Sequence, residues 1–467
     1  MRALLLLWCV ALALVSCGCV LDAPPPVEQQ LTALPSPQPP GALVAGAGKA
    51  ELAPDLTRVS AGLIGYGGPR TAVGMHDQLW ARAVVFKTGE TSIAIVTLDQ
   101  LVVPGAMART IATRAAALGI GSVFVHATHT HSGDGGYWHM PLAELSMFGP
   151  YNEAIERRHV DAAMAAIRVA IARERPAVLE YAAGDTTATV DPVTGKTLPR
   201  QPLNANRRRG DKGKCDPRFG RLLVRQASTG FTFAQLMFFS AHATVMTHDD
   251  RVISGDWPGA LSNAAESGPD RGCVSLVLTC AVGDAKPLPP GTDNDRDHAA
   301  AATRLANALK ASLPAAVRLP DVVIPEHGVP LREVVLRDAL PLLDMPFLPD
   351  WIVPVKLPLS ALADTLWMPD IASLRVLRLG DLLLVGWPGE PAMAHQLALR
   401  EAAQAAGFTD AWLVSNVGGW FGYVLDRESY DAGRGYENNF TLYGFDRGDK
   451  WLDMTLQAMR ALSTPHD

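Results

Sequence analysis

The chain has 467 residues, of which 48% are hydrophobic and 19% are charged, and its formal net charge is −6. This composition excludes an intrinsically disordered or collagen-like protein. The mild acidity also argues against a nucleic-acid partner held by phosphate contacts. The length allows two or three domains, or one large α/β domain.

The first residues have the pattern of a secretory signal. Arg2 precedes an apolar stretch, Ala3–Val15, which is too short to span a bilayer as a helix. The sequence Leu14–Cys17 resembles a bacterial lipobox, whose cysteine becomes the lipidated first residue of the mature protein. The alternative is an ordinary cleaved signal that contains a cysteine by chance. We predict a lipoprotein that Cys17 anchors in the bacterial cell envelope, facing the periplasm or the exterior.

A proline-rich segment, Pro24–Pro40, separates this signal from the rest of the chain. Prolines favour an extended backbone, and the segment has too little apolar surface to form a core. We therefore divide the chain into a lipoprotein signal over residues 1–16, a tether over residues 17–45 and a folded domain over residues 46–467.

The folded part alternates between predicted strands and helices. Ala83–Phe86 and Ser92–Leu98 flank a Thr88-Gly89 turn and predict a hairpin, and Asn152 can cap a helix that ends before Pro176. We therefore predict a single large α/β domain with a mixed β-sheet core flanked by helices. Further strands are predicted at Ser122–Val125, Val178–Tyr181, Leu222–Arg225, Phe231–Phe239, Val274–Leu278, Leu382–Val385 and Trp412–Val414, and further helices at Ala106–Leu118, Ala299–Ala311 and Pro391–Gly407.

The cysteines fall in a compartment where disulfides are permitted. Cys273 and Cys280 flank a predicted strand whose extended backbone would hold their Cα atoms about 23 Å apart, whereas a disulfide needs less than about 7 Å. We predict that these two do not pair. Cys215 is then the more suitable partner of Cys273, although a bridge to Cys19 or no disulfide at all is also compatible with the sequence.

Three histidines follow one apolar strand in the sequence Val125–Gly133. In an extended backbone His129 and His131 point to the same side, because side chains alternate with a period of two. Two imidazoles at a strand end are suited to metal binding or to acid–base chemistry. The motifs H-E-x-x-H, G-x-S-x-G and G-x-x-x-x-G-K-[ST], which mark three other chemistries, are absent from the sequence.

Two other predicted strands end near groups of the same kind. His242 follows one of them, and Glu390 follows the other after a Pro-Gly turn. Two histidines and a glutamate at three strand ends are a suitable ligand set for catalytic zinc, which takes three protein ligands and keeps one position open.

Around these residues the sequence resembles the neutral/alkaline, non-lysosomal ceramidase family. Thr128–Gly133 resembles the family's T-H-T-H-S-G, and Pro388–Glu390 resembles its P-G-E. Further matching segments occur in the family's order between about Gly62 and Gly444, so the resemblance covers nearly all of the folded part. These segments are Gly74–His76, Ala81–Ala83, Asn204–Arg207, His242–Thr244, Tyr430, Arg434–Glu437 and Leu442–Gly444.

The resemblance implies a fold like the family's N-terminal domain, a zinc site and a set of residues around the substrate carbonyl. Zn²⁺ would lower the pKa of a bound water to about 7 and polarise an amide carbonyl. Two of the surrounding residues would stabilise the oxyanion, and a histidine would move protons to the leaving amine. The implied zinc ligands are His129, His242, Glu390 and Tyr423, and the implied residues around the carbonyl are His131, Arg207 and Tyr436.

The chain departs from the family pattern in two places. Lys286 occupies the serine position of the family's G-D-V-S-P-N motif, and a lysine does not replace a serine nucleophile. The chain also ends soon after Tyr443, so we expect it to lack the family's C-terminal immunoglobulin-like domain. The apolar stretch Leu340–Trp367 is either a loop that covers a lipid substrate or a buried segment.

We therefore expect a zinc-dependent amidohydrolase that hydrolyses the amide bond of a ceramide-like N-acyl lipid to a fatty acid and an amine by zinc-activated water. The substrate would carry an apolar tail, no nucleic acid is expected as a partner, and the sequence leaves the oligomeric state open. One alternative is a zinc hydrolase of another amide or ester. The other is a lipoprotein of the same fold that binds a ligand or a metal without turnover.

Overall fold

The computed structural model describes residues 42–52, 54, 62–67, 70–140, 143–190, 197–208, 213–267, 272–291, 297–312, 317–318, 331–339, 371–431, 436–444 and 446–463. The predicted signal with Cys17, the tether up to residue 41 and the apolar stretch 340–367 lie outside these residues. Within the described part of the chain, no helix is both long enough and apolar enough to cross a membrane. The first strand, β1 (Val44–Glu51), begins close to the predicted domain start at residue 46.

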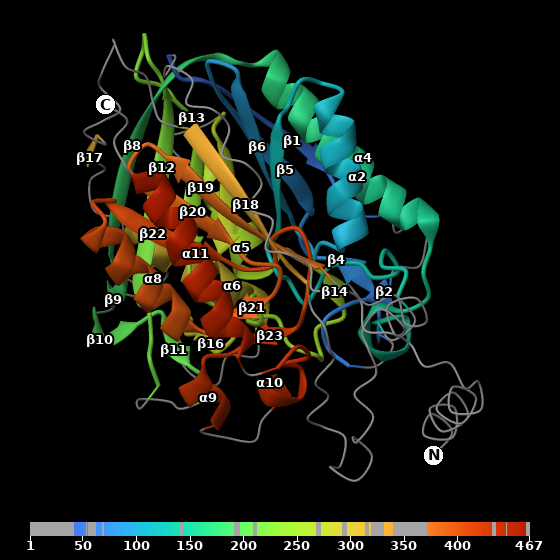
Figure 1. Ribbon diagram of the computed structural model, residues 1–467. Coiled ribbons are helices and arrows are strands. Elements are labelled where there is room, and N and C mark those ends of the chain that lie inside the picture. Colours follow the sequence, from blue (N-terminus) through green and yellow to red (C-terminus); the bar gives the residue numbers. More distant parts are fainter. Residues whose placement is uncertain are drawn as a thin grey trace, which may run out of the picture.

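A nine-stranded mixed sheet forms the centre of the molecule (Figure 1). Its order is β15-β13-β12-β8-β1-β5-β6-β7, with β17 (Val317–Arg318) paired to β8. The pairs β13–β15 and β6–β7 are parallel, and the other neighbours are antiparallel. The strands are β5 (Trp80–Thr88), β6 (Thr91–Leu98), β7 (Ser122–Ala127), β8 (Arg175–Asp185), β12 (Arg218–Gln226), β13 (Thr232–Phe239) and β15 (Val274–Thr279).

A second sheet packs face to face against the first. It contains β18 (Leu331–Ala339), β19 (Ile371–Leu379), β20 (Leu382–Gly386) and β22 (Asp410–Val414), and β20 and β22 are parallel. Side chains alternate between two cores along the strands: Val84 and Phe86 pack with residues of the second sheet, whereas Val85 belongs to the core shared with the helices. Phe238 of β13 stacks on Trp412 of β22 with ring centroids 5.4 Å apart.

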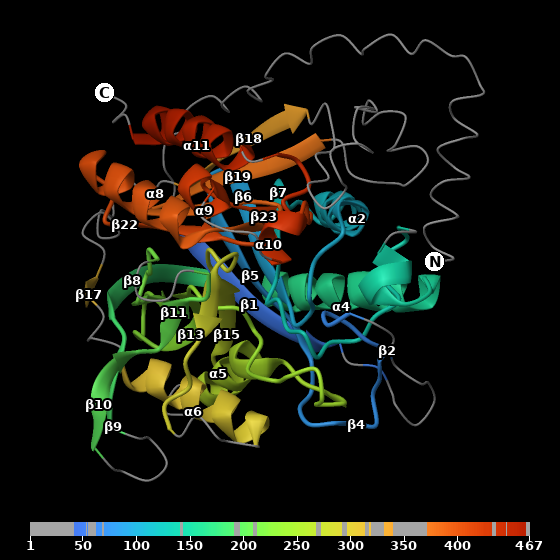
Figure 2. The same cartoon turned by 90° about the horizontal axis from the view of Figure 1, so that it is seen from below.

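Helices cover the outer faces of both sheets, as Figures 1 and 2 show. α4 (Glu153–Ala172) lies along β1, β5 and β6 beside α2 (Gly105–Ala116), and α5 (Asp256–Ser267) and α6 (His298–Ala311) cover the end of the large sheet that contains β15. α8 (Met393–Ala405) and α11 (Arg447–Ser463) cover the second sheet on the opposite side of the molecule. The result is a helix–sheet–sheet–helix arrangement in which both faces of each sheet are buried.

Glycines in β1 allow α4 to approach the sheet closely. A Cβ atom on Gly46 would lie 2.0 Å from the carbonyl oxygen of Ala170, and one on Gly48 would lie 2.4 Å from the carbonyl oxygen of Ala166. Both distances are far below van der Waals contact, so larger residues at these positions would push α4 away from the strand.

The predicted mixed α/β fold is confirmed. The predicted hairpin is formed by β5 and β6, and the side chain of Asn152 accepts a hydrogen bond from the backbone N–H of Ala154 at the start of α4. The helix predicted from Pro391 begins only at Met393, because Glu390–Pro391 forms a short strand, β21, that pairs with β23 (Tyr423–Val424). Helices α5 and α11 were not predicted.

The cysteine predictions have different outcomes. Cys280 carries a free thiol, so Cys273 and Cys280 do not pair, as expected. Cys215 is also free, so the pairing of Cys215 with Cys273 is wrong. The Cys215 sulfur lies 3.4 Å from the side-chain oxygen of Asn204 instead.

Short elements gather at one end of the two sheets, in the lower part of Figure 1. Four of them, β14 (Val252–Ile253), β16 (Ala285–Pro287), β21 and β23, follow strands of parallel pairs, and this end of a sheet is the usual place for a functional site in an α/β protein. The remaining short pairs are β2 (Gly62–Leu63) with β3 (Arg70–Thr71), β4 (Gly74–Met75) with β14, β9 (Thr187–Val190) with β10 (Thr197–Pro202), and β11 (Asn204–Asn206) with β16, and the short helices are a π-helix at Glu144–Phe148, α9 (Arg427–Asp431) and α10 (Tyr436–Asn439).

Candidate metal centre

Three predicted metal ligands come together at the carboxyl ends of three strands. His129 follows β7, His242 follows β13 and Glu390 follows β20. The segments after β7 and β13 lie side by side, since Thr130 and Ala243 form an isolated parallel bridge. The two sheets thus bring residues together that are far apart in the sequence.

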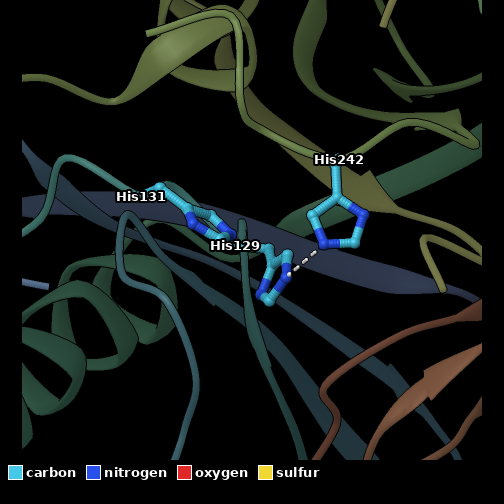
Figure 3. A group of neighbouring side chains, drawn as sticks. All are labelled: His129, His131 and His242. Carbon is cyan, nitrogen blue, oxygen red and sulfur yellow. Dashed lines mark hydrogen bonds between the residues drawn. The ribbon is translucent and has the colours of Figure 1, made fainter. Parts of the chain in front are cut away.

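The imidazoles of His129 and His242 direct the same ring nitrogen at one another. Their Nε2 atoms are 3.1 Å apart, as the dashed line in Figure 3 shows. The Nδ1 atom of His129 lies 2.8 Å from the carbonyl oxygen of Leu101, and that of His242 lies 2.6 Å from the carbonyl oxygen of Val282. A carbonyl only accepts hydrogen bonds, so each Nδ1 carries a proton, and the metal-binding form of each ring then presents a lone pair at Nε2.

Glu390 directs a carboxylate oxygen at the same point. Its Oε2 atom is 3.4 Å from Nε2 of His129 and 3.2 Å from Nε2 of His242, and it accepts no hydrogen bond within the described part of the chain. With Nε2 of both rings unprotonated, three lone pairs face each other in this buried place. A tetrahedron of ligands about 2.1 Å from zinc has edges of about 3.4 Å, so the three atoms are spaced as a shared cation requires.

The protonation states also suit a metal. Burial lowers the pKa of His242 to about 4, and the positive charge of Arg207 acts in the same direction. Burial opposes the ionisation of Glu390, but positive charge on the facing imidazoles of His129 and His242 holds the pKa of its carboxyl well below the usual value, and a cation bound at the same place would act in the same direction. A neutral imidazole and an ionised carboxylate are the forms that bind a metal ion.

His131 completes a triangle of imidazoles (Figure 3). Its ring centroid lies 5.0 Å from that of His129 and 5.7 Å from that of His242, and the ligand nitrogens of the three histidines all lie within 4.8 Å of one another. Both ring nitrogens of His131 are buried without a hydrogen-bond partner in the described structure. Burial, together with the neighbouring histidines, holds the pKa of His131 well below its usual value. The ring is therefore neutral and can accept a proton.

The backbone around these side chains is not extended, contrary to our expectation. His129 has a φ of 66°, a left-handed conformation that non-glycine residues rarely adopt. Ala281, which precedes the carbonyl that binds His242, has a φ of 39°, and Asn416 has a φ of 54°. Strained backbone of this kind concentrates at functional sites, where the surrounding structure holds it in place. His129 and His131 thus meet through a turn and not through strand alternation.

Asn416 is a site residue that we did not predict. Its side-chain amide lies 3.1 Å from Nδ1 of His129; since that nitrogen carries a proton, the amide oxygen, which has no other hydrogen-bond partner in the described structure, is the atom that can accept from it. The backbone N–H of Asn416 donates to the carbonyl of Gly389, which precedes Glu390. It follows Ser415 directly after β22, but one Ser-Asn pair after a strand is too common a signal to single out.

We expect Asn416→Gly to weaken zinc binding about 10–100-fold, the usual cost of losing a partner that orients a metal ligand. Glycine retains the left-handed backbone while it removes the amide, so the loss would report the side chain alone. Asn416→Ala removes the amide and also strains the backbone by about 1–2 kcal/mol, so it should additionally lower the melting temperature. Zinc affinity from competition with a chromophoric chelator, and thermal unfolding, measure the two effects. An unchanged affinity in Asn416→Gly would show that the amide does not support His129.

Tyr423 lies beside Glu390 because β21 and β23 pair these two residues directly. Its ring is nearly parallel to that of His242, with centroids 6.3 Å apart. Nη2 of Arg207 donates a hydrogen bond of 2.9 Å to the Tyr423 hydroxyl. Burial, followed by the charge of Glu390, keeps the pKa of Tyr423 well above its usual value. The structure thus places Tyr423 and Arg207 next to the candidate ligands.

Tyr436 lies at the outer edge of the site. It begins α10, it is half exposed, and its ring stands at 82° to that of Tyr423 with centroids 5.9 Å apart. The next residue, Glu437, was not predicted as part of the site, although it belongs to the matching R-G-Y-E segment. Its Oε1 atom lies 2.8 Å from Nε of Arg207 and its Oε2 atom lies 2.8 Å from Nη1 of Arg208, so Glu437 fixes both guanidinium groups.

The segment that contains Lys286 is hydrogen-bonded to residues of the site. Lys286 is exposed on β16, and the preceding Ala285 accepts a hydrogen bond from the backbone N–H of His242. Asp284 was not predicted either: its buried carboxylate accepts hydrogen bonds from the backbone N–H of Met393 and from the side chain of Asn206. Burial raises the pKa of Asp284 to about 6. This carboxylate links the segments that contain Glu390 and Arg207.

Comparison with known proteins identifies the family of the chain. The sequence profile of neutral/alkaline non-lysosomal ceramidase, N-terminal, matches residues 44–287, a range that includes four of the predicted site residues. Glu390, Tyr423 and Tyr436 lie beyond it. The four inside the range are His129, His131, Arg207 and His242.

Individual relatives match over most of the chain. Neutral ceramidase from Pseudomonas aeruginosa is 26% identical over 85% of this chain and 69% of its own length. Neutral ceramidase from Mycobacterium tuberculosis is 24% identical over 84% of this chain and 73% of its own length. The crystal structure of the Pseudomonas aeruginosa protein superposes with a TM-score of 0.71 at 22% identity, over 92% of this chain and 76% of that chain. Because the profile match alone covers more than half of the chain, the chain belongs to the neutral/alkaline non-lysosomal ceramidase family, a family of amide-bond hydrolases.

Proposed function

We propose that the protein is a zinc-dependent amidohydrolase that cleaves the amide bond of a ceramide-like N-acyl lipid, giving a fatty acid and an amine. The observation that carries the proposal is the group formed by His129, His242 and Glu390, whose three ligand atoms lie 3.1–3.4 Å from one another in a buried place. The substrate class follows from the relatives, which are named neutral ceramidases.

The residues present fit zinc. His129, His242 and Glu390 would hold the ion through two imidazole nitrogens and one carboxylate oxygen, and Tyr423 is the proposed fourth ligand because it lies beside Glu390. Bound zinc polarises a carbonyl and lowers the pKa of a bound water to about 7. The Nδ1 hydrogen bonds of both histidines to backbone carbonyls fix the ring orientation, as is usual for zinc-binding histidines.

The neighbouring residues have suitable chemistry for amide cleavage. Arg207 is held by Glu437 and by the carbonyl of Gly283, so its guanidinium is preorganised to donate to the oxygen of the substrate carbonyl as negative charge develops there. Tyr436 offers a hydroxyl at the mouth of the site, and burial raises its pKa to about 12, so it donates and does not ionise. His131 is neutral and its ring nitrogens have no hydrogen-bond partner among the described residues, so it can take a proton from the attacking water and give it to the leaving amine.

An aromatic wall next to the candidate ligands supports a substrate with an apolar tail. Trp420 contacts Glu390, the Trp420 ring lies 5.9 Å from that of Trp138, and the Trp138 ring lies 5.0 Å from that of Phe148. The hydroxyl of Tyr436 lies 4.0 Å from the sulfur of Met147. An acyl chain that follows such a wall would gain about 0.8 kcal/mol for each buried CH₂ group.

The test is hydrolysis of N-acyl lipids with increasing acyl chain length and of simple amides and esters, with and without a chelator. We expect chelation to stop hydrolysis, added Zn²⁺ to restore it, and kcat/KM to rise with chain length. Preference for short amides or esters would replace the ceramide-like substrate by another one. A purified protein that contains no metal and turns over no substrate would favour a binding protein of the same fold.

We also propose that a lipid on Cys17 attaches the protein to the bacterial cell envelope, on the basis of the lipobox-like Leu14–Cys17 and the proline-rich segment after it. Several acyl groups give stable attachment, whereas a single one binds only marginally. We therefore expect Cys17→Ala to leave the membrane fraction and to change its electrophoretic mobility, while the neighbouring Cys19→Ala remains membrane-bound. A Cys17→Ala protein that stays firmly in the membrane fraction with unchanged mobility would contradict lipidation.

A further inference from the structure

The two oxygens of the Glu390 carboxylate have different partners. Oε2 faces the two histidine Nε2 atoms, whereas Oε1 accepts a hydrogen bond of 2.8 Å from the indole N–H of Trp420. An indole N–H only donates hydrogen bonds, so Oε1 is the acceptor in this contact. Oε1 therefore accepts from Trp420, whereas Oε2 faces the histidines.

We propose that Trp420 is a positioning residue that restricts Glu390 to one-oxygen contact with the metal. The inference rests on the proposed function, because it concerns the same metal group. A carboxylate can bind a cation through one oxygen or through both. With Oε1 engaged by Trp420, only Oε2 is presented to the ion, and the coordination position that a second oxygen would take is kept for water or substrate.

The Trp420 ring is held firmly enough for this task. It stands edge-to-face against Trp138, with an interplanar angle of 89°, and Trp138 stands edge-to-face against Phe148 at 88°. Edge-to-face contact is a favoured geometry for pairs of aromatic rings. The buried rings of Trp138 and Phe148 thus hold the indole of Trp420, which in turn holds the carboxylate of Glu390.

The loop before Trp420 is shaped to place it. Gly418 has a φ of 68°, and its N–H donates to the carbonyl of Val125 on β7. A Cβ atom on Gly419 would lie 3.1 Å from the Cβ of Pro388, in the turn that carries Glu390. The Gly418-Gly419 pair therefore turns the chain away from β7 and brings the following indole against the carboxylate.

Trp420→Phe tests the inference, because phenylalanine retains a ring against Trp138 and removes only the N–H donor. We expect zinc affinity to fall about 10–100-fold, as for other partners that orient metal ligands. We also expect the visible absorption of the Co²⁺-loaded protein to weaken, since a freed Oε1 raises the coordination number and higher-coordinate Co²⁺ absorbs less strongly. The matched control is Trp80→Phe, which makes the same replacement at a tryptophan that packs over Lys49 at the start of β5, outside the metal group, and should leave both readouts unchanged.

Unchanged zinc affinity and an unchanged Co²⁺ spectrum in Trp420→Phe would overturn the inference while the proposed function stands. A wild-type protein that binds neither Zn²⁺ nor Co²⁺ would overturn both. Trp420→Leu removes the same donor with a smaller side chain and provides a second measurement if the phenylalanine variant does not fold. Equal losses in Trp420→Phe and Trp80→Phe would assign the effect to a general loss of stability and would also overturn the inference.

Discussion

Glu390→Gln is expected to abolish turnover and to strip the protein of most of its zinc. Glutamine has the same shape, but it removes the negative charge that faces Nε2 of His129 and Nε2 of His242 at 3.4 and 3.2 Å. Glu390 is buried, so its charge acts on the ion with little screening by water. Loss of a direct ligand should therefore lower zinc affinity by more than the ~10–100-fold that is typical of losing a residue that only orients a ligand.

Metal content after gel filtration and kcat/KM on an N-acyl substrate measure the two effects of Glu390→Gln. His129→Ala should behave in the same way, because it removes another of the converging lone pairs. Glu174→Gln is a suitable control: this carboxylate pairs with Lys87 at the far end of α4 and has no contact with the metal group. Full activity in a metal-free His129→Ala or Glu390→Gln protein would refute the zinc mechanism.

The location of the site could be predicted from the sequence because its ligands follow apolar strands. His129, His242 and Glu390 each come within a few residues of a hydrophobic run, and the parallel strands of an α/β protein expose their carboxyl ends at one side. Such a local pattern can be read from the sequence without knowledge of how the strands pack. The same reasoning placed the β5–β6 hairpin and the start of α4 correctly.

The supporting residues could not be predicted, because each acts through a partner that is distant in the sequence. Trp420 bonds Glu390, Asn416 lies against His129, and Glu437 holds Arg207. Each is an ordinary residue type in a loop or at a helix start, and only the packing of the two sheets assigns it a partner. The left-handed φ of His129 was unpredictable for the same reason, since tertiary contacts hold a conformation that the residue itself disfavours.

His131 could serve either as a metal ligand or as a group that transfers protons. Its ligand nitrogen lies within 4.8 Å of those of His129 and His242, so the three histidines form a group that can hold a metal. The tighter spacing of 3.1–3.4 Å belongs to His129, His242 and Glu390. We therefore assign His131 to proton transfer. Loss of the His131 side chain should then leave zinc bound, whereas loss of a ligand would release it.

His131→Ala should retain zinc and slow hydrolysis by about 10²–10⁴-fold, the usual contribution of a general acid or base. The metal would stay because the three converging ligand atoms remain, while the neutral ring that accepts and returns a proton is lost. Lys286→Ala is the matched comparison, since the exposed lysine has no bond-making role in this scheme and its loss should leave substantial activity. Zinc content, single-turnover rates and mass spectrometry for a covalent acyl-enzyme measure these outcomes. Loss of zinc from His131→Ala would make His131 a ligand, and an acyl group trapped on any side chain would replace direct attack by water with a covalent mechanism.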